Sequence, residues 1–229
     1  MVIGNGLIAK AFNSYIGNKD VVIFASGVSN STTNKIEDFN REITLLKSTI
    51  EQFLNCVFVY FSTCSVHDNT QSSSPYVLHK LQAEGIVKQH AKVYFIFRVS
   101  NVVGNTTNPN TIFNYLVHCI KNDIHFYLWK NATRNLLDVS DLFLLVNYTL
   151  KNCEPIKEEI NIANSNHYSV PYIVKSIENY LNRKANCTIL EKGNTVFIDT
   201  DFVQVICKEM FINFKDDYIL KMLEKYYQQ

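Results

Sequence analysis

The sequence lacks the features by which zinc sites, disulfide frameworks and polyanion-binding surfaces are recognised. Its six cysteines are scattered without a C-x-x-C pair, so neither a metal site nor a set of disulfides is predicted. The net charge is only +1, and no block of basic residues stands out. This balance argues against nucleic acid and anionic membranes as partners.

Long apolar runs are absent as well. No stretch is long enough to span a bilayer, and the start MVIGNGLIAKAF lacks the basic region and apolar stretch of a signal peptide. We therefore expect a cytoplasmic protein in a reducing compartment. What the 229 residues do contain is 47% hydrophobic side chains, enough for one domain with a sizeable core and an attached lobe.

Short apolar stretches alternate with segments of helical periodicity in the first part of the chain. Residues 20–27, 56–65 and 92–104 are typical of strands buried on both faces, and residues 35–54 and 72–91 are typical of helices. This alternation predicts an α/β fold with a Rossmann-like, doubly wound parallel sheet.

The sequence pattern changes after Gly104. From there it predicts loops, helices and shorter strands in succession, without a repeat or a linker. We expect residues 1–104 to form the dinucleotide-binding domain, with residues 134–152 returning to it. Residues 105–229 are expected to form mainly a small C-terminal α/β lobe that binds substrate.

The first turn carries glycines where a dinucleotide-binding turn needs them. Gly4-Asn5-Gly6-Leu7-Ile8-Ala9 has the pattern G-x-G-x-x-A between the first strand and the first helix. Glycines let the backbone turn tightly and approach a pyrophosphate, which a helix N-terminus then attracts. Any tight strand-to-helix turn can carry two glycines, so the pattern alone is a weak signal.

Tyr76 and Lys80 stand four residues apart near the start of the helix predicted at residues 72–91, and thus share one helix face. The preceding strand ends in Ser62 and Thr63, at the edge of the sheet where ligands bind in open α/β folds. A hydroxyl, a phenol and an ammonium can therefore meet beside the glycine turn. Two further Tyr-x-x-x-Lys pairs, which begin at Tyr15 and Tyr180, and also His79, are expected to lie on exposed helix surface.

Taken in order, these segments resemble the extended short-chain dehydrogenase/reductase family, in its nucleotide-sugar epimerase, dehydratase and reductase branch. The motifs follow the family's order over nearly the whole chain, which is more specific than any one of them. They are VIGNGLIAKAF, DVVIFASG, FNREITLLKSTIE, VYFSTCSV, SPYVLHK, FRVSNVVG, TRNLLDVSDL and NIANSNHYSV.

The resemblance implies a role for individual residues. The implied catalytic residues are Tyr76, Lys80, Thr63 and Asn40. The implied cofactor contacts are Gly4, Asn5, Gly6, Leu7, Ile8, Ala25, Ser26, Gly27, Tyr76, Lys80 and Val99. The implied substrate contacts are Thr63, Asn101, Asn110 and Arg134, with Arg134 at the phosphate-contacting position.

The chain departs from the family pattern in three places. Ile3 replaces the usual first glycine, and His67 and Asp68 replace the Tyr-Gly after the Ser/Thr strand. The chain also passes from the first helix directly to DVVIFASG, where the family has two further strands, one of which contacts the adenosine ribose. We expect DVVIFASG to lie beside the first strand, which then becomes a sheet edge. The alternative is that DVVIFASG is itself the family's second strand.

The resemblance implies an NAD(P)-dependent oxidoreductase that acts on a nucleotide-diphosphate sugar. Our first expectation is reduction of a 4-keto-6-deoxy sugar nucleotide, with NADP preferred, NAD as the alternative cofactor and Tyr76 as the proton donor. A 4-epimerase stays open, and so does a catalytically silent NAD(P)-binding or regulatory protein. By analogy with the family, a homodimer through the helices that hold Asn40 and Tyr76 is expected.

Overall fold

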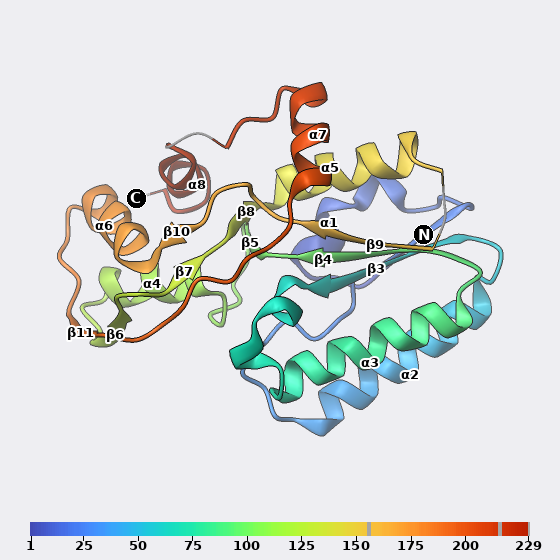
Figure 1. The fold of residues 1–229 in the computed structure, drawn as a ribbon, viewed down its shortest axis with the longest axis horizontal. Helices are drawn as coiled ribbons and strands as arrows, with labels where there is room; N and C mark the ends of the chain where they lie inside the picture. The colour runs from blue at the N-terminus through green and yellow to red at the C-terminus, as the bar shows by residue number, and fades with distance from the viewer. Residues whose placement is uncertain (155–156, 215–216, 229) are drawn as a thin grey trace.

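The computed structural model describes residues 1–154, 157–214 and 217–228. Five parallel strands form its central sheet in the order β1-β2-β3-β4-β9 (Figure 1). These strands are β1 (Val2–Ile3), β2 (Val21–Phe24), β3 (Val57–Thr63), β4 (Val93–Val99) and β9 (Lys157–Ile162). The α/β, Rossmann-like prediction is therefore confirmed.

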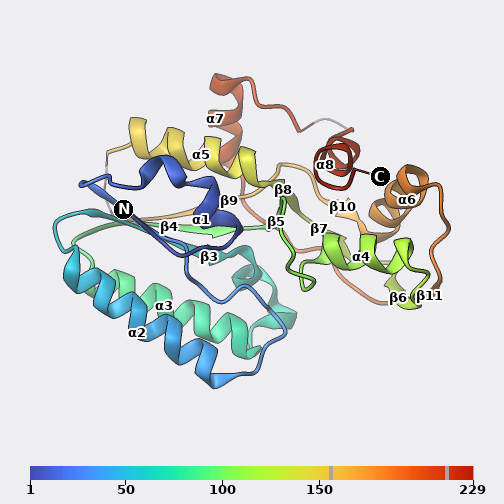
Figure 2. The ribbon, with the colours of Figure 1, turned by 180° about the vertical axis from the view of Figure 1, so that it is seen from behind.

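Helices cover both faces of the sheet, which is why the central strands read as almost continuous apolar runs. Helices α2 (Ile36–Gln52) and α3 (Pro75–His90) lie side by side on one face. Helix α1 (Leu7–Ala11) and helix α5 (Val139–Asn152) contact one another on the other face (Figure 2). Helix α7 (Asp201–Met210) packs against α5 and β9.

The position of β2 settles the question raised by the short N-terminal half. β2 pairs with β1 on one side and with β3 on the other, so β1 is the edge of the sheet. The expectation that residues 20–27 lie beside the first strand and make it an edge is confirmed. The alternative is wrong, because a second strand of the usual kind would leave the third strand to pair with β1 on its other side.

One strand of the second half belongs to the main sheet. β9 pairs in parallel with β4 along its length and closes the sheet at the edge opposite β1. The assignment of residues 105–229 mainly to a substrate lobe therefore needs a correction at this strand. An edge strand with alternating polar residues, as in KEEINI, does not carry the continuous apolar signature of the other strands.

The remaining elements form the smaller lobe, to the left of the sheet in Figure 1. Its strands pair two by two: β5 with β8, β6 with β11 and β7 with β10. The bounds are β5 (Asn101–Val103), α4 (Ile112–Lys121), β6 (Phe126–Trp129), β7 (Thr133–Arg134), β8 (Leu136–Asp138), β10 (Tyr168–Ser169), α6 (Val170–Leu181), β11 (Cys187–Leu190) and α8 (Tyr218–Tyr226). Short 3₁₀ turns are η1 (Asn13–Tyr15), η2 (Cys64–His67) and η3 (Asn69–Gln71).

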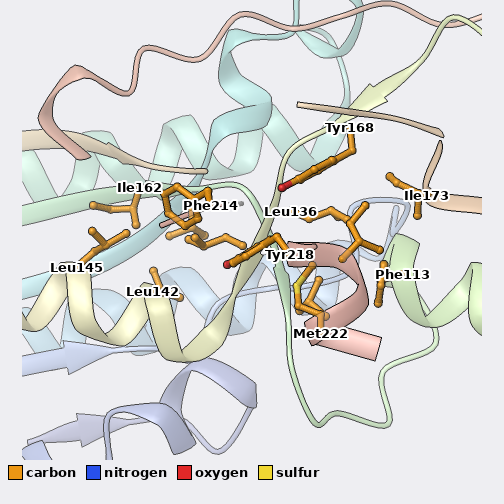
Figure 3. Packing of buried hydrophobic residues seen from close by; sticks show 14 of the residues in the cluster. Phe113, Leu136, Leu142, Leu145, Ile162, Tyr168, Ile173, Phe214, Tyr218 and Met222 are labelled. Atoms are coloured by element: carbon orange, nitrogen blue, oxygen red, sulfur yellow. The ribbon is translucent and has the colours of Figure 1, made fainter. Parts of the chain in front are cut away.

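A shared hydrophobic core joins the lobe to the sheet (Figure 3). Leu142 and Leu145 of α5 and Ile162 of β9 belong to the same buried cluster as Met222 of α8. Because this core is continuous, the lobe is held against the carboxyl ends of the strands. Within the three described ranges, no helix is both long enough and apolar enough to cross a membrane.

Candidate active site

A cavity of about 1050 Å³ opens between the carboxyl ends of the strands and the lobe. Its walls come from the first turn, from the ends of β2, β3 and β4, from the start of α3, and from the β7 region of the lobe. This is the edge of an open α/β sheet at which ligands bind, and the volume is at the upper end of the range for small-molecule sites.

Most residues predicted for the site line this one cavity. They are Asn5, Gly6, Leu7, Ile8, Ala25, Ser26, Gly27, Thr63, Tyr76, Lys80, Val99, Asn101, Asn110 and Arg134. Two predicted residues do not line it. Gly4 lies in the exposed first turn beside the lining residues Asn5 and Gly6, and Asn40 is exposed on α2.

The two glycines of the first turn suit their positions for different structural reasons. Gly4 has a φ of +127°, and a Cβ there would lie 2.4 Å from the carbonyl oxygen of Ala25. The turn therefore packs directly against the end of β2. A Cβ at Gly6 would have no other atom within 4 Å, so the backbone there borders open space. Such an exposed backbone beside the start of α1 fits the close approach of a pyrophosphate.

Tyr76, Lys80 and Thr63 are brought together by the short step from β3 to α3. Ser74 caps α3 by accepting a hydrogen bond from the Val77 N–H at 3.2 Å, and Pro75 occupies the first turn. This places the half-buried Tyr76 and the buried Lys80 over the end of β3. The Thr63 hydroxyl oxygen accepts a hydrogen bond from the Ser65 N–H at 3.1 Å, which fixes it at the same wall.

The partner of Lys80 is Glu42, a residue that sequence reasoning missed. Lys80 Nζ donates hydrogen bonds to Glu42 Oε1 at 3.0 Å and to the hydroxyl oxygen of Tyr60 at 3.1 Å. The Glu42 side chain is 0% exposed and the Lys80 side chain 3%. The structure therefore puts a carboxylate beside the lysine, whereas Asn40, which the resemblance implied as a catalytic residue, is exposed.

The signal for Glu42 was present in the sequence. The buried residues of α2 are Glu42, Leu46, Thr49 and Ile50, at the spacing i, i+4, i+7 and i+8 of one helix face. Asn40 lies two residues before Glu42 and thus points away from that face. A single carboxylate on a buried stripe predicts a buried ionic partner, since a lone buried charge is costly.

Glu42 is fully supplied with donors. Its Oε1 also accepts from the Tyr60 hydroxyl at 2.7 Å, while its Oε2 accepts from His79 Nε2 at 2.8 Å and from the Val28 N–H at 2.6 Å. Burial alone would raise the pKa of Glu42, but the charge of Lys80 and these hydrogen bonds lower it from 4.5 to about 2. Burial, followed by the charge of Glu42, raises the pKa of Tyr60 well above 10.

His79 and Tyr15 differ from their predicted exposure. His79 is buried, with its ring stacked on Phe39 at 4.5 Å between centroids. Tyr15 is also buried and donates a hydrogen bond to Asn147 Oδ1 at 3.0 Å. Both were expected on exposed helix surface because spacing alone does not show which helix face is covered. Neither the Tyr15 pair nor the Tyr180 pair lines the cavity.

Arg134 faces the cavity from β7. Its Nη1 donates a hydrogen bond to the Thr133 carbonyl oxygen at 2.7 Å, and no carboxylate of the described residues forms an ion pair with it. Burial lowers the pKa of Arg134, and the charge of Asp68 opposes that shift. A partly desolvated guanidinium without a carboxylate partner fits an anionic ligand.

Three further polar atoms around the cavity lack a hydrogen-bond partner within the described part of the chain. They are Ser100 Oγ, Thr133 Oγ1 and His167 Nε2, and all three are buried in residues of the cavity wall. Buried polar atoms are rarely left unpaired in native proteins. Their presence fits a polar ligand. Sequence analysis did not single them out, although the quoted motifs FRVSNVVG, TRNLLDVSDL and NIANSNHYSV contain them, because a motif does not show which of its side chains are buried.

Arg41 is another cavity residue absent from the predictions. Its Nη1 donates a hydrogen bond to Ser26 Oγ at 3.2 Å, and its Nη2 donates to the Ser26 carbonyl oxygen at 3.1 Å. The guanidinium therefore lies at the end of β2, beside the region where the adenosine half of a dinucleotide would run.

Comparison with known proteins identifies one family and a set of similar folds. The model of the NAD dependent epimerase/dehydratase family matches residues 5–163. A search of curated proteins finds no match.

Among solved structures, the chain is similar to UDP-glucuronic acid 4-epimerase from Bacillus cereus in complex with UDP-glucuronic acid and NAD. The TM-score is 0.71 at 19% identity, over 94% of this chain and 78% of that chain. It is also similar to the Bordetella bronchiseptica enzyme WbmG in complex with NAD and UDP, with a TM-score of 0.67 at 15% identity over 96% and 77%. RMD from Pseudomonas aeruginosa complexed with NADPH gives 0.68 at 14% identity over 89% and 91%. At these identities the likeness shows the fold.

Proposed function

The chain belongs to the NAD dependent epimerase/dehydratase family, and we propose that it is an NAD(P)H-dependent reductase of a nucleotide-linked 4-keto-6-deoxy sugar. The observation that carries the proposal is the meeting of Tyr76, Lys80 and Thr63 in one cavity with the glycine turn and an unpaired arginine. Each of these groups has a use in reducing a ketone on an anionic substrate.

The residues present fit the cofactor in two of its three parts. Gly4 and Gly6 form a turn with exposed backbone for the pyrophosphate, and Gly27, Tyr76 and Lys80 border the space for the nicotinamide half. The adenosine half would lie beyond β1, where the sheet has ended. When bound, the reduced cofactor supplies the hydride for the ketone carbon.

The chain's own residues then complete the reaction. Tyr76 gives its phenolic proton to the oxygen that develops negative charge, as a general acid does. The Thr63 hydroxyl holds the same oxygen by a hydrogen bond. Lys80 holds the nicotinamide ribose and stabilises the phenolate that Tyr76 leaves behind.

Arg134 is assigned to the substrate diphosphate, because its forked guanidinium matches phosphate oxygens with paired hydrogen bonds. Asn101 and Asn110 border the same space and are assigned to the sugar. Two of the similar structures contain UDP or a UDP-sugar, which supports a nucleotide diphosphate as the common part of the substrate.

The cofactor is expected to bind with modest affinity and little discrimination between NADPH and NADH. The edge position of β1 removes the usual ribose contact, while Arg41, Ser29 and Ser31 offer polar groups for a 2′-phosphate. We therefore retain a slight preference for NADPH. Titration of the protein with both reduced cofactors checks this, and tight binding with a strong preference for either would contradict it.

The open adenosine side also favours a reductase over a 4-epimerase. A reductase exchanges oxidised for reduced cofactor in every cycle, whereas an epimerase retains its cofactor and re-reduces its own intermediate. Fewer contacts at one end of the cofactor suit exchange. An absorbance spectrum of the purified protein with bound NAD would favour the epimerase.

The division into residues 1–104, with 134–152 returning, and a substrate lobe remains a proposal, now with β9 moved to the sheet. We also retain the homodimer through α2 and α3. On their outer surfaces Ile36, Leu78 and Leu81 are exposed, by 65%, 54% and 42%. Light scattering of the purified protein measures the oligomeric state, and a monomer at all concentrations would exclude this assembly.

The direct test of the proposed function is an assay with a set of uridine, thymidine and guanosine diphosphate 4-keto-6-deoxy sugars. Loss of NADPH or NADH absorbance with one of them is the expected result. The same sugar nucleotides without a keto group are the control. If cofactor binds but no keto sugar is reduced and no sugar nucleotide is epimerised, the protein is a silent dinucleotide-binding protein.

A further inference from the structure

Glu42 lies directly behind the Tyr76–Lys80 pair and has no place in the mechanism above. It comes from α2, and its contacts converge from three other parts of the chain: Val28, Tyr60 on β3, and His79 and Lys80 on α3. Figure 2 shows α2 and α3 running side by side beneath the sheet. A carboxylate with 0% exposure and four donors is a built feature of this site.

The charges of Glu42 and Lys80 cancel within this cluster. Glu42 is held ionised by its four donors, and Lys80 Nζ is paired with it at 3.0 Å. His79 donates through Nε2, while its buried Nδ1 has no partner in the described part of the chain. Tyr60 stays a neutral phenol, since burial and the Glu42 charge raise its pKa.

The geometry also fixes where the ammonium can act. Two of the three donors of an ammonium group are used by Glu42 and Tyr60, which leaves one for the cavity. A Cβ at Gly27 would lie only 2.6 Å from Lys80 Nζ and 3.1 Å from Glu42 Oε1. The end of β2 therefore needs glycine so that the ion pair can lie against the cavity wall.

We infer that Glu42 is a positioning residue that fixes the Lys80 ammonium at the cavity wall and offsets most of its charge, so that the ammonium favours the phenolate of Tyr76 less than an unpaired lysine would. A lysine without a carboxylate would favour the phenolate of a nearby tyrosine. A lysine paired with a buried carboxylate does so less. This favours the protonated form of Tyr76, which can donate to a ketone oxygen. This use of the proton rests on the proposed reductase function.

Other charged or titratable groups surround Tyr76 and are part of the balance. Within the cavity wall these are Arg41 from α2, Asp68 from the segment after β3, and Arg134 from β7. On the same side of the sheet, Tyr60 is affected by the charges of both Tyr76 and Glu84. Glu42→Gln leaves the charges of these groups unchanged, so the contribution of the Glu42 charge can be isolated.

The first test needs neither cofactor nor substrate. The ultraviolet absorbance of tyrosinate is followed against pH in the wild type and in Tyr76→Phe, and the difference isolates Tyr76 among the 13 tyrosines. The same pair is measured in a Glu42→Gln background. We expect the Tyr76 titration to move to lower pH by roughly one unit, because the ammonium is no longer neutralised. An unmoved titration would overturn the inference.

Glu84→Gln is the matched control. Glu84 is also buried on this face and also accepts a hydrogen bond from a hydroxyl of β3, but its cation is Arg98 and not Lys80. Its replacement is expected to leave the Tyr76 titration within a few tenths of a pH unit of the wild type. An equal shift in Glu84→Gln would show that the effect of Glu42 is general and would also overturn the inference.

A double variant covers the case in which Glu42→Gln does not fold. Glu42→Gln with Lys80→Met removes both charges and leaves no unpaired buried ion. Because the pair is neutral in the wild type, Tyr76 is expected to titrate in the double variant near its wild-type pH. A displacement of a unit or more to higher pH would show that Lys80 acts on Tyr76 with its full charge, and the inference would fail.

The pH profile of turnover provides the link to function. In Glu42→Gln, the rate of ketone reduction is expected to fall at a lower pH on the alkaline side than in the wild type, and Glu42→Asp is expected to restore part of the range. If the titration shift is found but the wild type reduces no keto sugar, the proposed function fails while the role of Glu42 stands. If reduction is found without any shift, the reverse holds.

Discussion

Two buried carboxylates on the α2–α3 face have nearly the same surroundings and opposite uses. Glu42 accepts hydrogen bonds from Lys80 and Tyr60, and Glu84 accepts them from Arg98 and Ser62. The two hydroxyls come from β3, two residues apart, and so lie on the same face of the strand. The two centres are thus built in the same way.

They differ in what lies beyond them. The Glu84 centre continues to the surface, where Arg98 and Lys88 also bind the partly exposed Glu159 at 2.6 and 2.7 Å. The Glu42 centre ends at the cavity, which Lys80 lines. The Glu84 ion pairs connect α3 to β4 and β9. The Glu42–Lys80 pair instead borders the cavity, where it presents a partly neutralised ammonium to a ligand.

The largest difference in activity is expected between variants of the two tyrosines near the Glu42–Lys80 pair. Tyr76→Phe removes the general acid and should lower turnover by roughly 10²–10⁴-fold with little change in cofactor affinity, because the ring stays. Tyr60→Phe removes the hydrogen bonds of that hydroxyl to Glu42 and from Lys80 but no acid group, and should cost far less activity. Steady-state reduction rates and cofactor titration measure both. Wild-type turnover in Tyr76→Phe would show that another group is the acid.

Removing the cation of each centre is expected to lower the free energy of unfolding by different amounts. Lys80→Met leaves Glu42 buried without a counter-charge, which typically destabilises a protein by about 3–5 kcal/mol. Arg98→Met should cost less, because Lys88 remains 3.8 Å from Glu84 and that network reaches solvent. Urea unfolding of both variants gives the comparison. Equal losses would mean that the Lys80 pair is no more enclosed than the Arg98 pair.

The acid side of the stability curve gives a third contrast. Because the folded pKa of Glu42 is depressed from 4.5 to about 2, its contribution is present above pH 4.5 and is lost as the pH falls toward 2. The shift corresponds to about 3 kcal/mol. Glu42→Gln should therefore flatten the fall in stability across this window more than Glu84→Gln. Unfolding curves between pH 5 and about 3 that run parallel to the wild type would contradict the assignment.

The two arginines extend the comparison to ligand binding. Arg98 is held by two carboxylates, whereas Arg134 faces the cavity and forms no ion pair with a carboxylate of the described residues. Arg134→Ala should weaken the binding of a nucleoside diphosphate roughly tenfold or more, as the loss of a charged hydrogen bond does, and leave cofactor binding nearly unchanged. Calorimetry measures the affinities, with Arg98→Ala as the control. Equal nucleotide affinity in wild type and Arg134→Ala would remove Arg134 from the site.

Much of the fold could be predicted from the sequence because its signals are local. The apolar strands, the glycine turn and the Ser74-Pro75 helix start each depend on neighbouring residues. β9 was assigned to the lobe with the rest of residues 105–229, and its alternating pattern does not show that it joins the main sheet. Thr63 was placed in the cavity because it ends a strand, and Tyr76 and Lys80 because they share one face at the start of the next helix.

What could not be predicted depends on which helix face is covered. Asn40 was chosen over Glu42 by motif resemblance, although the buried stripe of α2 contains Glu42 and not Asn40. His79 was expected to be exposed because residue spacing does not show which face of a helix is covered. The buried polar atoms of Ser100, Thr133 and His167 carry no sequence signal, because they converge only after the lobe has packed on the sheet.

The most direct test of the account is a crystal structure with NADPH and a nucleoside diphosphate. The account predicts the pyrophosphate of the cofactor at the Gly4–Gly6 turn, the nicotinamide beside Tyr76 and Lys80, and the adenosine exposed beyond β1. It also predicts the nucleoside diphosphate at Arg134, with Lys80 still bound to Glu42. A nicotinamide placed away from Tyr76, or a cofactor that draws Lys80 off Glu42, would contradict it.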